Sequence, residues 1–330
     1  MSTINISIDI YTKVELVLQK KGISIELPDL NKAYCFSSLA ECLESKEEHL
    51  SLVQAQLMFW KPKPSTCFKL IVQSESPIGA GLGASSSLCI SLIKVFKELA
   101  KHNFCTQPLE DILEKNEGVL FKNQIVNLAA NLEAKVLKMP TGTQDYFPAL
   151  TEGLHIVDYG PKGFVDNLLT APYLNSLAKH LVLVYTGQPH HSGISNWKII
   201  RDYLDGSKSV SLALQGLAEV SQEMKKCFCQ LEENFSKNED FAKKWFSNIP
   251  KLFIKELGLR KQLNSGFVTK EIESLRSVAL QWGGVEIKVC GAGAGGCVLV
   301  WVDAEKKISL QKKLKEHKYK VLDFNFVSKS

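Results

Sequence analysis

The chain has 330 residues, 45% of them hydrophobic, and carries 40 basic against 35 acidic side chains for a net charge of +5. This length and composition suit one large or two medium globular domains with a sizeable core. No apolar stretch approaches the roughly 20 residues that span a bilayer, and the N-terminus lacks a signal-peptide pattern, so we expect no membrane partner. The charges are interspersed, so we also expect no nucleic-acid partner.

The nine cysteines are scattered and include no C-x-x-C pair. The nearest two, Cys227 and Cys229, fall in an expected helix, where this spacing points them to different faces. We therefore interpret the cysteines as buried thiols in a reducing cytosol rather than as disulfides or zinc ligands.

The N-terminal quarter predicts strands followed by a helix. Apolar residues alternate from Ile4 to Ile10 and again from Val14 to Leu18, which predicts two antiparallel strands or one long bent strand. Residues 36–60 look helical, and residues 68–73 read as a short strand.

A glycine-rich turn comes next, and between Pro77 and Leu88 it reads Pro-Ile-Gly-Ala-Gly-Leu-Gly-Ala-Ser-Ser-Ser-Leu. Three glycines remove the side chains that would keep a ligand off the backbone, and the helix that follows places its partial positive charge there. The segment fits neither a Walker loop, which ends in Gly-Lys-Ser/Thr, nor the G-x-G-x-x-G dinucleotide fingerprint. A Gly/Ser linker is the alternative, but linkers do not run into an amphipathic helix. We interpret the turn as a nucleotide triphosphate loop.

After residue 107 we expect two helices, the second of which carries Glu133 and is ended by Pro140 and Gly142. Asp145 follows in the turn. Phosphoryl transfer to a hydroxyl needs such a pair, with one carboxylate on magnesium and one to orient or deprotonate the hydroxyl. Taken alone, Glu133 could equally be a solvent-exposed helix carboxylate.

The second half begins with strands at 154–157 and 180–185. The loop after them carries His190, His191 and Trp197, so it could recognise a sugar or phosphate, or its histidines could simply be exposed. Residues 194–282 look helical and are followed by strand 285–290, a glycine turn, strand 297–302, helix 304–317 and strand 319–326. A boundary near 190 would divide an α+β half from a helical hairpin with a small split β-α-β unit.

The second glycine turn contains Gly291, Gly293 and Gly296, which satisfy G-x-G-x-x-G literally. The dinucleotide interpretation requires a helix next, whereas a strand follows; the protein-kinase interpretation requires a catalytic domain downstream, and too little chain remains. A tight glycine hairpin without a ligand is the alternative.

Together the segments resemble the GHMP kinases (galactokinase, homoserine kinase, mevalonate kinase, phosphomevalonate kinase). The first turn is similar to that family's P-x-x-x-G-L-G-S-S motif, with Ala84 at the first serine and Ser85 at the second. The run from Lys288 is similar to K-x-x-G-A-G-G-G-G, and residues 142–145 resemble the Gly-x-Gln-Asp element of its sugar kinases. The resemblance implies an α+β, two-domain fold, with a ribosomal protein S5 domain 2-like half at 1–190 and a ferredoxin-like half at 191–330.

The resemblance also implies site residues. Asp145 would be the catalytic base, and Ser85 and Glu133 would hold Mg²⁺. ATP would bind the loop formed by Gly79, Ala80, Gly81, Leu82, Gly83, Ala84, Ser85 and Ser86. The substrate would contact Gly142, Gln144, Gly291, Gly293, His190 and His191.

The implied activity is ATP-dependent phosphorylation of a sugar or sugar-phosphate hydroxyl in the cytoplasm, in the branch related to D-glycero-D-manno-heptose 7-phosphate kinase. A mevalonate or isoprenoid-alcohol kinase is the runner-up. The family's opening motif, A-P-G-R-x-x-L-x-G-E-H-x-D, has no counterpart here, so we expect that the chain starts after that segment or lacks it. A non-catalytic nucleotide- or sugar-binding member therefore stays an alternative, and a homodimer is left open.

Overall fold

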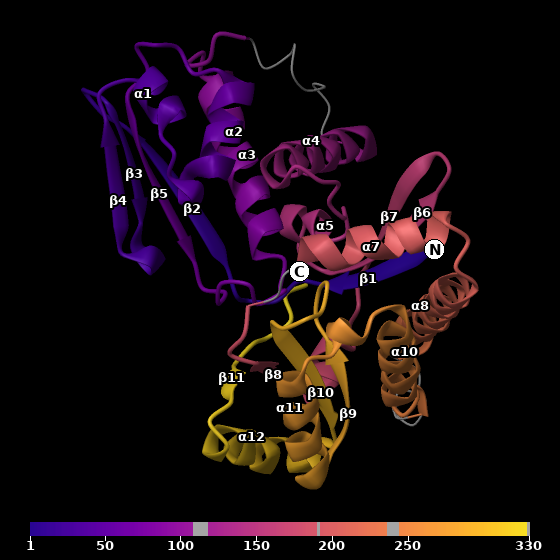
Figure 1. Ribbon diagram of the computed structural model, residues 1–330. Coiled ribbons are helices and arrows are strands. Elements are labelled where there is room, and N and C mark those ends of the chain that lie inside the picture. Colours follow the sequence, from indigo (N-terminus) through magenta and orange to yellow (C-terminus); the bar gives the residue numbers. More distant parts are fainter. Residues whose placement is uncertain (108–117, 190–191, 236–243, 329–330) are drawn as a thin grey trace. The chain divides into compact units, whose positions relative to one another are not determined.

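The computed structural model describes residues 1–107, 118–189, 192–235 and 244–328, and the chain divides into two compact units (Figure 1). The first unit contains Met1–Asp9, Pro77–Leu82 and Thr151–Ser330, and the second contains Ile10–Ser76 and Gly83–Leu150. These compact units are discontinuous in sequence, and the predicted domain boundary near residue 190 stays a prediction. The first glycine turn is divided between the units, because Pro77–Leu82 belongs to the first and the residues from Gly83 onward belong to the second.

The second unit is built on a four-stranded sheet of order β2-β5-β3-β4. The strands are β2 (Thr12–Leu18), β3 (Ile23–Leu27), β4 (Lys32–Phe36) and β5 (Phe68–Ser74), and β3 runs parallel to β5. Alternate residues of β3 and β5 are buried, as one covered face of a sheet requires. The described helices of this unit are η1 (Pro28–Leu30), α1 (Leu39–Glu44), η2 (Glu48–Leu50), α2 (Ser51–Trp60), α3 (Ala84–Lys101), α4 (Val119–Leu137) and α5 (Tyr146–Leu150).

Helix α3 packs on this sheet through an aromatic contact. The ring of Phe96 in α3 lies edge-on to Phe68 in β5, with centroids 6.2 Å apart. Figure 1 shows α2 and α3 beside the sheet. This packing holds α3, which begins where the first glycine turn ends, on the sheet.

The first unit contains two antiparallel sheets. One has the order β1-β6-β7, from β1 (Ser2–Ile6), β6 (Leu154–Gly160) and β7 (Gly163–Leu169). The other has the order β11-β8-β10-β9, from β8 (Leu181–Tyr185), β9 (Gly284–Val289), β10 (Cys297–Val302) and β11 (Lys320–Leu322). Counted along the chain this is 4-1-3-2 with helices in the first and last connections, which confirms the split β-α-β, ferredoxin-like unit.

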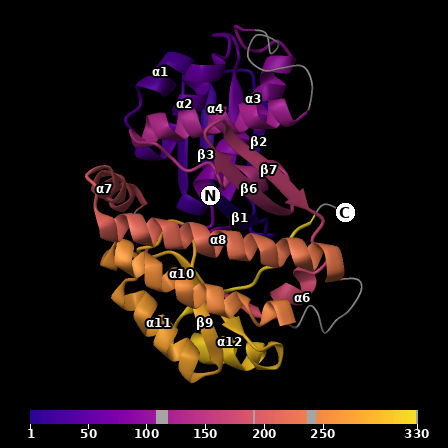
Figure 2. The same ribbon diagram turned by 90° about the vertical axis from the view of Figure 1, so that its right-hand side faces the viewer.

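Helices cover both faces of the β11-β8-β10-β9 sheet. Val182 and Val300 pack in one core cluster with residues of α11 (Lys270–Gln281) and α12 (Lys307–Glu316). Leu181 and Trp301 pack in another with residues of α8 (Lys208–Asn234) and α10 (Ile249–Leu263), which Figure 2 shows side by side. The remaining helices are α6 (Leu174–Ala178), α7 (Ser192–Leu204), η5 (Ser265–Phe267) and η6 (Ala304–Lys306).

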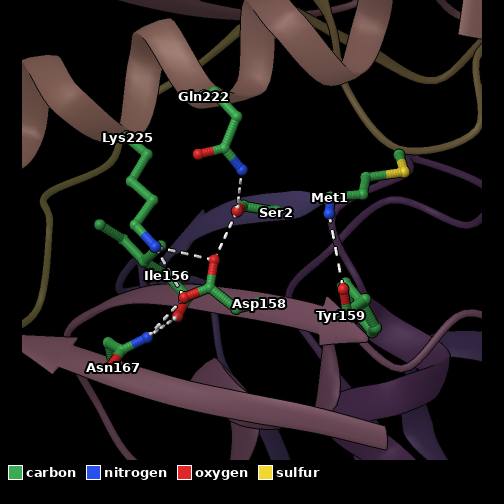
Figure 3. Close-up of polar contacts among 8 residues, drawn as sticks. All are labelled: Met1, Ser2, Ile156, Asp158, Tyr159, Asn167, Gln222 and Lys225. Carbon is green, nitrogen blue, oxygen red and sulfur yellow. Dashed lines mark hydrogen bonds and ion pairs between the residues drawn. The ribbon is translucent and has the colours of Figure 1, made fainter. Parts of the chain in front are cut away.

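A polar cluster fastens β1 and β6 to α8 (Figure 3). Lys225 Nζ lies 2.7 and 2.9 Å from the two carboxylate oxygens of Asp158, while Ser2 and Asn167 donate to the same carboxylate. Gln222 donates to Ser2 Oγ at 2.9 Å. Burial raises the pKa of Asp158, but the hydrogen bonds from Lys225 and Ser2 outweigh it, so the pKa is lowered.

Several expectations about the elements need correction. The predicted strands at 4–10 and 14–18 are β1 and β2, which lie in different sheets and so neither pair nor form one bent strand. Residues 36–60 are not one helix, because β4 ends at Phe36 and the helical part is broken between α1 and α2. Strands β3, β4 and β7 were not anticipated, and the closing strand is limited to β11. The first helix expected after 107 lies outside the described residues.

The cysteines are free thiols, and five of the nine are buried. Burial raises the pKa of Cys89 and Cys227 to about 12, which keeps both protonated at neutral pH. Cys35 is exposed, so the expectation that all nine are buried is wrong. Within the described part of the chain, no helix is long and apolar enough to cross a membrane.

Candidate active site

The helix start predicted to bind phosphate follows a glycine in the left-handed region. Helix α3 begins at Ala84 after Gly83, which has a φ of +73° and lends no side chain as a cap. Gly83 therefore supplies no cap for the first-turn N–H groups of α3, and the helix dipole adds partial positive charge there. Ser85 is exposed and Ser86 is buried in this turn. Such an end suits an anion.

Asp145 packs directly against this helix start. A Cβ atom added at Gly83 would lie 3.1 Å from Cβ and 3.4 Å from Cγ of Asp145. Because Gly83 also has a positive φ, only glycine allows the loop and the aspartate to approach this closely. The structure therefore brings the predicted base and the predicted phosphate-binding helix start together within the second unit.

The loop before Asp145 is held by its own side chains. A Cβ atom at Gly142 would overlap the amide of Gln144, so the Gln144 side chain lies over Gly142. Asp145 is half-buried and directly precedes α5. The two predicted substrate residues, Gly142 and Gln144, therefore touch each other.

Glu133 is buried rather than exposed, which excludes the solvent-exposed alternative. It is 6% exposed on α4, and its Oε2 accepts the hydroxyl of Tyr146 at 2.5 Å and that of Ser86 at a longer 3.5 Å. Burial and the neighbouring Glu133 charge raise the pKa of Tyr146, so its hydroxyl stays protonated as a donor. Tyr146 was not anticipated, and its position next to Asp145 was the signal for it.

In the first unit, the two glycine segments interlock. The Cys297 N–H donates to the Ala80 carbonyl at 2.6 Å, beside Gly296. A Cβ atom at Gly296 would lie 2.6 Å from that carbonyl oxygen, and one at Gly291 would lie 2.9 Å from the Gly81 oxygen. Both glycines have positive φ, so the contact between these backbones depends on them. The two motifs, more than half the chain apart in sequence, are therefore one structural feature.

The end of strand β8 joins the same feature. Thr186 donates from both its N–H and its hydroxyl to the Gly296 carbonyl, and the Gly296 N–H donates to Gln188 at 2.8 Å. The Tyr185 hydroxyl donates to the Ile78 carbonyl at 3.2 Å. The predicted recognition loop is thus fixed to both glycine segments up to residue 189. His190 and His191 lie outside the described residues.

A charged cluster, also not anticipated, supports the second glycine turn. Arg260 donates to the Gly291 carbonyl at 3.0 Å and pairs with Glu256 at 2.6 Å, and Lys288 pairs with the same Glu256 oxygen at 2.8 Å. Burial raises the pKa of Glu256, but Lys288 and Arg260 outweigh it and lower the pKa. The i,i+4 spacing of Glu256 and Arg260 on one helix was the available signal. Gly293 lies beside Phe267, whose carbonyl accepts the Ala294 N–H.

The predicted ATP-binding residues form one continuous segment shared by two units. Gly79 to Leu82 belong to the first unit together with Gly291 and Gly293, whereas Gly83 to Ser86 belong to the second together with Glu133 and Asp145. Each half makes the local contacts described above, and the binding of ATP to them stays a prediction. A single cleft that includes Asp145 and the Gly291–Gly296 turn remains a prediction.

The donor set in the second unit fits a magnesium ion. Mg²⁺ takes oxygen ligands and is commonly held by one or two carboxylates together with substrate phosphates. Ser85 offers an exposed hydroxyl, and the hydrogen bonds of Glu133 to described residues use Oε2, leaving Oε1 for a cation. Among the described residues, no three His, Cys, Asp or Glu side chains form a metal cluster, so phosphates would have to complete the shell.

Comparison with known proteins identifies relatives along nearly the whole chain. Residues 48–153 match the GHMP kinases N terminal domain. The D-glycero-alpha-D-manno-heptose 7-phosphate kinase of Campylobacter jejuni is 25% identical over 98% of this chain and 88% of its own. The mevalonate kinase of Methanocaldococcus jannaschii is 22% identical over 97% of this chain and 91% of its own.

Solved structures agree on the fold. The D-glycero-D-manno-heptose 1-phosphate kinase from Bacteriodes thetaiotaomicron superposes with a TM-score of 0.67 at 17% identity, covering 100% of this chain and 88% of that one. At this identity the likeness concerns the fold alone, and it confirms the two-domain α+β class.

Proposed function

We propose that this chain, a member of the GHMP kinase family through its N-terminal domain, transfers a phosphoryl group from ATP to a hydroxyl of a sugar or sugar phosphate. The observation that carries the proposal is the packing of Asp145 on Gly83 at the start of α3, directly after the glycine segment that interlocks with the Gly291–Gly296 turn. Backbone N–H groups, a helix dipole and a carboxylate are the groups that phosphoryl transfer requires.

Each residue has a defined task in this reaction. The segment from Gly79 to Ser86 binds the ATP phosphates, and Asp145 orients the acceptor hydroxyl and takes its proton. Bound between Ser85, Glu133 and the phosphates, Mg²⁺ would neutralise charge that develops on the transferred group. Gly142, Gln144, Gly291 and Gly293, together with His190 and His191, are proposed to contact the acceptor.

A phosphorylated heptose is the acceptor class that the relatives support. The Campylobacter relative is named for heptose 7-phosphate, and a structural neighbour for heptose 1-phosphate. Among the described residues, Arg260 and Lys288 share the Glu256 carboxylate beside the Gly291 turn, so this cluster of three side chains has a net positive charge suited to an acidic acceptor. Mevalonate, also an anion, is the second candidate, because the Methanocaldococcus relative covers the chain almost as fully. A cytoplasmic location is part of the proposal, in keeping with the free thiols.

A panel of acceptors tests the proposal. The purified chain with ATP and Mg²⁺ is offered heptose 7-phosphate, heptose 1-phosphate, galactose and mevalonate in turn, and ADP release is followed by a coupled assay. We expect turnover with a heptose phosphate well above the rate without acceptor. Turnover with mevalonate alone would assign the second candidate. Nucleotide binding without acceptor-dependent ADP release would identify a non-catalytic member instead.

A further inference from the structure

We infer that Tyr146 is a positioning residue for the proposed magnesium site: its hydroxyl fixes the Glu133 carboxylate so that Oε1 is presented to the cation. The inference rests on the proposed function and deepens it. Tyr146 is fully buried and Glu133 nearly so, and the 2.5 Å bond between them is the shorter of the two that Oε2 accepts. A hydroxyl that donates to a carboxylate makes a charge-assisted bond, which is stronger than one between neutral groups.

The two oxygens of the Glu133 carboxylate have different partners, and this difference is why the Tyr146 contact matters for a cation. A carboxylate rotates about its terminal bond unless its partners hold it. Among the described residues, Tyr146 and Ser86 donate to Oε2 from two different elements, which leaves one defined oxygen for a cation. Partners that orient a metal ligand in this way commonly change metal affinity by 10- to 100-fold when removed.

Tyr146 also connects the metal site to the catalytic loop. It follows Asp145 directly in the chain, and Asp145 in turn packs on Gly83, three residues before Ser86. The contacts therefore form a closed ring from the α3 start through Glu133 and Tyr146 to Asp145 and back. Within this ring one tyrosine contacts the carboxylate that would hold the cation and directly follows the residue whose carboxylate would take the proton.

The test compares two tyrosine-to-phenylalanine changes that each remove one buried hydroxyl. Tyr173 is the matched control, because it is also fully buried and its hydroxyl donates to the Phe228 carbonyl at 3.2 Å in the first unit. Both Tyr146→Phe and Tyr173→Phe should destabilise the fold to a similar extent, seen as similar downward shifts in the midpoint of urea unfolding. Binding of Mn²⁺ is then measured by electron paramagnetic resonance in the presence of a non-hydrolysable ATP analogue.

We expect Tyr146→Phe to weaken Mn²⁺ binding by at least tenfold, and Tyr173→Phe to change it by less than twofold. In steady-state assays, Tyr146→Phe should raise the Mg²⁺ concentration needed for half-maximal rate while leaving the KM for the sugar within about twofold. Equal Mn²⁺ affinities in the two variants would overturn the inference, because a merely structural hydroxyl predicts that result.

A double-mutant cycle keeps the inference testable even if Tyr146→Phe loses stability. In a Glu133→Gln background, adding Tyr146→Phe should have little further effect on Mn²⁺ affinity, since both changes disable the same ligand. Additive losses would contradict the inference. If the unaltered chain binds no Mn²⁺ with the analogue, the proposed function itself fails; if it binds and Tyr146→Phe binds equally well, only the role of Tyr146 fails.

Discussion

Replacing Gly296 by alanine tests the interlocking of the two glycine segments. The new Cβ atom would lie 2.6 Å from the Ala80 carbonyl oxygen, so the two backbones must separate by about 0.8 Å to reach ordinary contact at 3.4 Å. The Ala80 oxygen already accepts the Cys297 N–H at 2.6 Å and cannot move without loss of that bond. Overpacking of this kind costs about 1 to 3 kcal/mol, in addition to about 1 kcal/mol for alanine at positive φ.

Gly206→Ala is the control that separates the cost of positive φ from the cost of the close contact. Gly206 has a φ of +82°, close to the +77° of Gly296, but an added Cβ atom there meets nothing within 4 Å. Urea unfolding should therefore show a loss of about 1 kcal/mol for Gly206→Ala and a clearly larger loss for Gly296→Ala. Calorimetry with a non-hydrolysable ATP analogue should show at least tenfold weaker binding only for Gly296→Ala, because sub-ångström displacements at a reacting site are costly. Equal nucleotide affinities in the two variants would refute the reasoning.

Two further changes have definite expected outcomes. Asp145→Asn keeps the shape and removes the charge, so ATP affinity measured by calorimetry should hold while kcat falls by about 10² to 10⁴; an undiminished kcat would move the base elsewhere. Lys225→Met should lower the free energy of unfolding by about 1 kcal/mol at pH 7, against a few tenths for Lys255→Met in a more exposed pair with Glu223. The pKa of Asp158 is lowered in the folded chain, so its contribution to the free energy of unfolding is present above the unfolded pKa of about 3.9 and is lost as the pH falls further. The loss of stability caused by Lys225→Met should therefore become smaller in acid. A larger loss in acid would contradict the role given to this cluster.

Local patterns in the sequence predicted the elements whose signals are local. The run after Gly83 has helical periodicity and a glycine start, and α3 begins there as expected. Strands β8 and β10 are largely buried apolar runs, β5 buries alternate residues, and all three lie within one residue of the expected bounds. Pairing partners are not local, which is why the alternation from Ile4 onward identified strands but not that β1 and β2 join different sheets.

In the candidate site, too, local motifs could be predicted from the sequence and contacts between distant segments could not. Asp145 and the two glycine turns were found from residue types and spacing, because each motif carries its chemistry within a few residues. The burial of Glu133 under Tyr146 and the pairing of Glu256 with Lys288 depend on elements that meet only in the folded chain. Arg260 donates to the Gly291 carbonyl from a helix some thirty residues earlier. No local sequence pattern connects these two residues, so this contact could not be predicted.

The most direct test of the central claim follows the γ-phosphoryl group itself. The chain is incubated with γ-labelled ATP, Mg²⁺ and heptose 7-phosphate, and the labelled products are separated and identified by mass spectrometry. The account predicts that the label appears in a heptose bisphosphate, and that it does so far more slowly with Asp145→Asn. Label found only in inorganic phosphate or retained in ATP, with every sugar phosphate of the panel, would contradict the assignment of this chain as a sugar-phosphate kinase.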